Sequence, residues 1–67
     1  MITRRTFLSK AYSIVAEEQA CYYRTLMIDA VTMKTSEELC ACAQEAGDLM
    51  VARVKRRLDE LKAEASR

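Results

Sequence analysis

Three cysteines are the most reactive side chains in this sequence, but their spacing does not favour chemistry. The 67-residue chain carries Cys21, Cys40 and Cys42 and contains no histidine. Histidine is the commonest general base and the nitrogen ligand of most zinc and iron sites, so catalysis would have to rest on carboxylates, thiols or lysines. Cys40 and Cys42 are two residues apart on an expected helix, where their side chains diverge. We expect small core residues at Cys21 and Cys40 and a free thiol at Cys42, where a redox switch is the alternative.

Four carboxylates are the second group that could support catalysis. Glu17, Glu18, Glu45 and Asp48 are expected at similar heights in a helical hairpin. Paired carboxylates can act as acid and base, but they need a cleft, which two thin helices do not provide. We therefore expect a solvated acidic belt, no enzyme activity, no metal and no cofactor.

A basic run, RVKRR at positions 53–57, could contact nucleic acid. A phosphate-binding surface needs its cations on one stripe, but at 100° per residue Lys55 points nearly opposite Arg53. A nucleic-acid-binding hairpin dimer of the ROP type remains the alternative function, by analogy of architecture alone.

Composition points to a small helical protein. The chain has one glycine, no proline, 51% apolar residues and a net charge of +1. Few turn-forming residues favour long helices, and no apolar run is long enough for a membrane span. Three cysteines without a disulfide spacing suggest a reducing compartment, so we expect a cytoplasmic protein. Residues 3–10 (TRRTFLSK) resemble a twin-arginine export motif, but the apolar stretch after them stops at Ala16, and we expect a basic helix start.

The second half of the chain predicts one helix over about 36–65. Thr35 and Glu38 fit a capping box at its start. Apolar residues then recur at steps of three and four, and from Gly47 onward they alternate as in a heptad seam: Gly47, Val51, Val54, Leu58, Leu61 and Ala65.

The first half predicts a helix over about 4–31 that is apolar around most of its circumference between residues 20 and 31. A loop at about 32–35 makes the two helices antiparallel. Tyr22 and Tyr23 should then face Ala43, Ala46 and Gly47, and we expect close packing of a ring against Gly47.

A two-helix hairpin cannot cover apolar residues on several sides of one helix. We therefore expect a single all-α domain over 1–67, an antiparallel hairpin that dimerises into a four-helix bundle, with a hetero-complex as the alternative. The expected hairpin and dimer core comprises Tyr12, Val15, Tyr22, Tyr23, Leu26, Met27, Ile28, Val31, Ala43, Gly47, Val51, Val54, Leu58 and Leu61.

One stripe of the second helix is the candidate partner-binding surface. Cys42, Leu49 and Arg56 recur every seven residues, with Glu45 and Arg53 beside them, and we expect this stripe to face away from the first helix. An apolar centre beside arginine is typical of interaction hot spots. The sequence therefore predicts a non-enzymatic homodimer that binds and modulates a larger protein, as an adaptor or an inhibitor of the kind that phages and plasmids encode.

Overall fold

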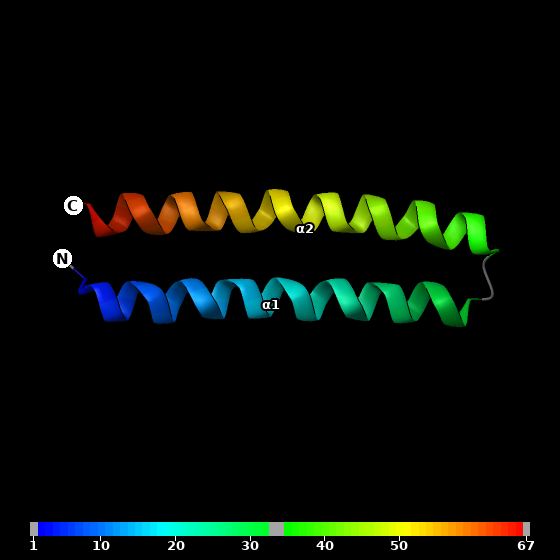
Figure 1. The fold of residues 1–67 in the computed structure, drawn as a ribbon, viewed down its shortest axis with the longest axis horizontal. Helices are drawn as coiled ribbons and strands as arrows, with labels where there is room; N and C mark the ends of the chain where they lie inside the picture. Colours follow the sequence, from blue (N-terminus) through cyan, green and yellow to red (C-terminus); the bar gives the residue numbers. More distant parts are fainter. Residues whose placement is uncertain (1, 33–34, 67) are drawn as a thin grey trace.

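The computed structural model is an antiparallel pair of long helices (Figure 1) and describes residues 2–32 and 35–66. Helix α1 spans Arg4–Val31 and helix α2 spans Ser36–Ala65, which are the ranges expected from the sequence. Positions 33–34 of the expected loop, including Met33, lie outside the described residues. Within the described part of the chain, neither helix has an apolar stretch long enough to cross a bilayer.

Both helices begin at a threonine cap. The Thr6 amide donates to Thr3 Oγ1 at 3.1 Å, and the Glu38 amide donates to Thr35 Oγ1 at 3.2 Å. Each bond satisfies an amide that has no partner inside its helix. The hydroxyl half of the predicted capping box at Thr35 is thereby confirmed.

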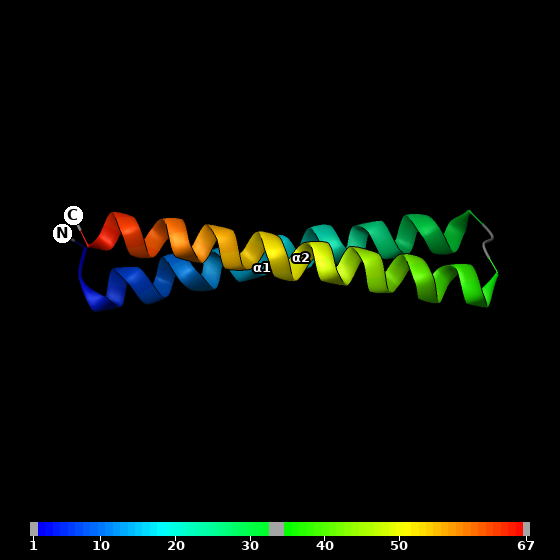
Figure 2. The same cartoon turned by 90° about the horizontal axis from the view of Figure 1, so that it is seen from above.

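The hairpin is long and thin, and its two helices cross at a shallow angle (Figure 2). Its principal extents are 49 × 15 × 11 Å, and its radius of gyration is 15.3 Å. A compact domain of this length would have a radius of about 11 Å. The chain therefore spreads its apolar residues along a line instead of enclosing them.

The seam between the helices holds very little fully buried apolar surface. Among the described residues, Leu61 is the one apolar side chain that is buried, at 5% exposed. The rest of the seam includes half-buried residues at steps of three and four, with Glu18 between Ile14 and Tyr22: Phe7, Ala11, Ile14, Tyr22 and Leu26 in α1, and Leu39, Ala43, Ala46, Met50 and Val54 in α2.

Several residues of the expected core are exposed in the single hairpin: Tyr12, Tyr23, Met27, Ile28, Val31 and Val51. The expectation that Tyr23 packs on the small residues of α2 is wrong, because its side chain is 58% exposed. Successive helical residues differ by 100°, so only one tyrosine of the pair can face α2. Tyr22 does so and is half-buried.

The predicted contact between Tyr22 and Gly47 is confirmed. A Cβ atom added to Gly47 would lie 3.7 Å from Tyr22 Cε1, which is an ordinary van der Waals distance. The ring therefore packs beside the glycine but leaves room for one methyl group.

Gly47→Ala is expected to stabilise the protein by about 1 kcal/mol, because alanine removes the backbone-entropy cost of a helical glycine without a clash. Thermal or urea unfolding followed by circular dichroism measures this. Gly47→Leu is the matched variant and should destabilise, since its larger side chain must displace the Tyr22 ring. A loss of stability in the alanine variant would show that the contact is tighter than the structure has it.

Candidate functional site

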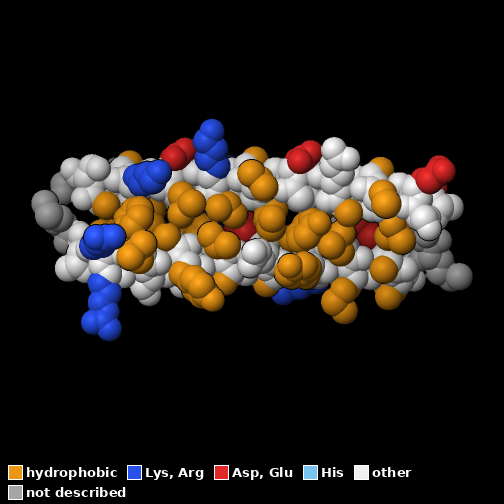
Figure 3. Space-filling model, viewed as in Figure 1, with side chains coloured by type: hydrophobic (Ala, Val, Ile, Leu, Met, Phe, Trp, Pro, Cys, Tyr) orange, Lys and Arg blue, Asp and Glu red, His pale blue; other side chains and the backbone are white. Residues whose placement is uncertain are grey.

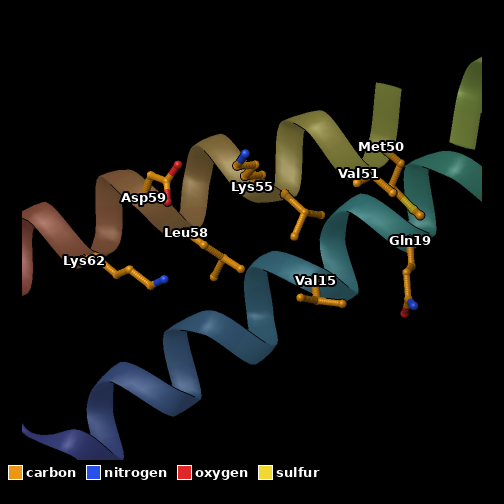
Figure 4. Close-up of a pocket in the computed structure, with 9 residues that line it drawn as sticks. Val15, Gln19, Met50, Val51, Lys55, Leu58, Asp59 and Lys62 are labelled. Carbon is orange, nitrogen blue, oxygen red and sulfur yellow. The ribbon is translucent and has the colours of Figure 1, made fainter. Parts of the chain in front are cut away.

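One face of the hairpin carries a shallow groove between the helices (Figure 4). It encloses about 420 Å³. Its floor is mainly apolar, and charged residues of α2 form one edge. The lining residues are Val15, Gln19, Met50, Val51, Val54, Lys55, Leu58, Asp59 and Lys62.

The α1 side of this groove continues along the helix as an uncharged stripe. Leu8 and Tyr12 lie seven residues before Val15 and Gln19, so they share the groove's face. Tyr23 follows Gln19 by four residues, and Met27 follows Tyr23 by four. Leu8, Tyr12, Tyr23 and Met27 are all exposed large apolar side chains. We call the face formed by this stripe and the groove residues the groove face; hydrophobic side chains gather over both helices in Figure 3.

The opposite edge of the seam holds a cluster of charges. Glu18 is only 4% exposed and accepts hydrogen bonds from Arg53 Nε at 2.9 Å and Arg53 Nη2 at 3.4 Å. Arg57 Nη1 donates to the same carboxylate at 3.0 Å, and Arg57 Nη2 donates to Glu17 at 2.9 Å. Arg53 thus holds one carboxylate with two nitrogens, the forked geometry that suits carboxylates, and Arg57 bridges two carboxylates. The cluster joins the two helices near their middle.

The cluster stabilises the charged forms of its members. The hydrogen bond from Arg53 is the main cause that lowers the pKa of Glu18; burial opposes it, and Arg57 adds to the lowering. Hydrogen bonds to Glu17 and Glu18 raise the pKa of Arg57. Glu18 is therefore a carboxylate at neutral pH despite its burial.

Acid should destabilise the fold through Glu18. Because the pKa of Glu18 is lower in the folded chain than its usual 4.5, the unfolded chain binds this proton more tightly. The stabilisation is therefore complete above pH 4.5 and is lost as the pH falls through the folded pKa. Thermal melts between neutral pH and acid should show a smaller decline in Glu18→Gln than in the native chain. In the control Glu64→Gln the decline should match that of the native chain, because Glu64 is exposed and its ion pair with Lys10 is long, at 3.9 Å. An equal decline of the melting temperature with pH in all three proteins would contradict the role of Glu18.

The acidic belt expected at Glu17, Glu18, Glu45 and Asp48 is wrong for Glu18. Glu45 and Asp48 are exposed as expected, whereas Glu18 is buried against two arginines. A signal for this was present in the sequence, because Phe7, Ala11, Ile14 and Glu18 follow steps of four, three and four along α1. Glu18 therefore occupies a seam position by spacing.

The candidate stripe of α2 is not turned away from α1. Leu49 and Arg53 line a second depression, of about 200 Å³, together with α1 residues that include Glu18 and Tyr22. Cys42 is half-buried, while Glu45 is exposed and Arg56 faces solvent, 3.9 Å from Glu60. The expectation that Leu49 and Arg53 face away from α1 is therefore wrong.

The physical reason is a rotation of α2 relative to the expected seam. The seam was expected to run through Val51, but Val51 is 62% exposed, and Arg57 is half-buried instead. The carboxylate of Glu18 needs cationic partners, and this rotation supplies Arg53 and Arg57.

Within the described residues, no three Cys, Asp or Glu side chains are grouped so as to hold a metal ion, and the three cysteines are free thiols. The expectation that Cys21 and Cys40 are small core residues is wrong, because both are exposed. No protein-family model matches the sequence, and no similarity to a characterised protein or to a solved structure is significant.

Proposed function

We propose that this chain is a non-enzymatic, cytoplasmic protein-binding module that acts as a homodimer, a four-helix bundle made of two hairpins. The observation that carries the proposal is the groove face, where Leu8, Tyr12, Tyr23, Met27 and Val51 are all exposed. An exposed apolar face of this kind contributes to stability only when another protein surface covers it and removes it from water.

The exposed area supports a dimer. The hairpin exposes 5492 Å², whereas a compact monomer of its mass exposes about 4,300 Å². The excess is about 1,200 Å² per chain, so pairing would bury about 2,400 Å² in total. That area falls in the range of obligate homodimers.

The arginine contacts favour protein binding over nucleic-acid binding. Arg53 and Arg57 point at Glu18 and Glu17, and their charges are largely neutralised there. A phosphate backbone would have to compete with these carboxylates.

The side of α2 that lies away from the groove is the surface that we propose for a larger partner. Leu49 is 60% exposed, and Arg56 stands in solvent one turn before Glu60. Neither lines the groove, so both remain accessible when the groove face is covered. The module would act by occupying its partner's binding surface, as an adaptor or an inhibitor does.

Sedimentation equilibrium and affinity capture test the two parts of this proposal. The native chain should sediment at twice its 7.6 kDa mass. Leu49→Asp and Arg56→Glu should leave this mass unchanged and lower the yield of a captured partner at least about tenfold, the effect expected of a hot-spot residue. Ala41→Asp, at an exposed site on the same helix, is the control. A chain of single mass contradicts the dimer, and undiminished capture by both variants contradicts the binding surface.

A further inference from the structure

The exposed stripe of α1 has a spacing that reads the same in both directions. Its members are Leu8, Tyr12, Ala16, Gln19, Tyr23 and Met27, at steps of four, four, three, four and four. Reversal pairs leucine with methionine and tyrosine with tyrosine. A two-fold interface needs this property, because residue i must contact residue j while j contacts i. The stripe therefore suits a second α1 that runs antiparallel to the first.

The groove-side edge of α2 has the matching charge order. Its half nearer Ser36 carries Glu37 and Asp48, and its half nearer Ala65 carries Lys55 and Lys62. An antiparallel copy of α2 places each acidic half beside a basic half. Asp59, the remaining charge on this edge, would lie beside Gln44 of the second copy, whose amide can donate to it.

The two symmetry centres fall at the same height in the hairpin. The α1 stripe is centred between residues 17 and 18, and the α2 edge is centred near Val51. The contact of Tyr22 with Gly47 sets these two points opposite each other. Val15 and Gln19 flank the first centre, Met50 and Val54 flank the second, and all four line the groove. One two-fold axis can therefore pass through the middle of the groove and relate both helices at once.

We propose that the occupant of the groove face is a second copy of this chain, related by a two-fold axis perpendicular to the helices, so that the chain ends of one hairpin lie over the loop end of the other. This rests on the dimer of the proposed function and specifies its orientation. Tyr12 packs on Tyr23 of the second copy, Val51 packs on its own counterpart, and Lys55 pairs with Asp48 of the second copy.

The other face-to-face arrangement, with both loop ends on the same side, fits less well. There the uncharged stripe of α1 would pack on the charged edge of α2 from the second copy. Lys55 and Lys62 would then lie against Leu8 and Tyr12, and their charges would lose water without gaining an acidic partner. In this arrangement the acidic halves of the two α2 helices would also lie at the same end of the dimer, away from the two basic halves.

Distances between nitroxide labels decide the orientation without touching the interface. In a chain with Cys21→Ser, Cys40→Ser and Cys42→Ser, one new cysteine is introduced at Ser36, Ser66 or Ala52 and labelled. Ser36 and Ser66 mark the two ends of α2, and Ala52 marks its middle; all three are exposed. At 1.5 Å per residue, the proposed axis puts the two Ser36 labels about 45 Å apart, and likewise the two Ser66 labels. The Ala52 labels should lie within about 30 Å, given neighbouring helix axes 8–10 Å apart.

The label sites separate the possible outcomes. Long distances at both ends with a short distance at Ala52 support the proposal. Short distances at all three sites would show a dimer with its loop ends together, which overturns this orientation but leaves the proposed function standing. No measurable distance at Ala52 would mean that the chain does not pair with itself, and both proposals would then fail.

Discussion

Tyr23→Glu is expected to raise the dimer dissociation constant about a thousandfold. Tyr23 is 58% exposed in the hairpin, so a single copy loses little when its ring is removed. In the proposed dimer each ring is covered by Tyr12 of the other copy. A buried aromatic at an interface contributes about 2 kcal/mol, and the two-fold axis counts it twice, so about 4 kcal/mol is lost. Helix content should fall with dimer content, because the described residues of one hairpin bury one apolar side chain, Leu61.

Analytical ultracentrifugation over a concentration series, with circular dichroism on the same samples, measures both effects. Ile28→Glu is the matched control, since Ile28 has nearly the same exposure, 55%. It lies nine residues beyond Gln19, which places it on the opposite side of α1 from the groove. Its dissociation constant should stay within a few fold of the native value. Equal weakening in the two variants would mean that the groove face is not the dimer interface.

The helices could be predicted because their signals are local. Thr35 was predicted to cap the second helix, and its hydroxyl does so in the structure. The antiparallel hairpin followed from a connection too short for any other arrangement. The contact of Tyr22 with Gly47 followed from counting residues back from that connection. None of these steps requires knowledge of the rotation of one helix against the other.

The candidate site depended on that rotation, and there the sequence was ambiguous. Val51 and Arg57 lie on neighbouring stripes of α2, and hydrophobicity alone favours Val51 for the seam. The structure exposes Val51 and half-buries Arg57, because Glu18 on α1 takes a seam position and needs cations. A buried carboxylate and its partners are coupled across more than 30 residues, so periodicity within one helix does not reveal them. Because Val51 lies outside the seam, its side chain lines the groove and adds to the apolar surface of the groove face.

Glu18→Arg is expected to lower the melting temperature by about 10 °C, the largest effect of any single charge change in the hairpin. The new guanidinium would lie beside Arg53 and Arg57 with one carboxylate, Glu17, left in the cluster. Arg53 is half-exposed, so water screens part of the repulsion and the effect stays below that of a fully buried charge reversal. Arg53→Glu should also destabilise, because it places a third carboxylate beside Glu17 and Glu18.

The double variant Glu18→Arg with Arg53→Glu should recover most of the lost melting temperature, because a forked ion pair across the seam is restored with its polarity reversed. Melts at one fixed chain concentration are required, since the stability of a dimer depends on concentration. Arg56→Glu reverses an exposed charge on the same helix and should change the melting temperature by no more than about 2 °C. If the decrease in melting temperature of the double variant equalled the sum of the decreases in the two single variants, Glu18 and Arg53 would not be coupled. The rotation of α2 that exposes Val51 would then need another cause.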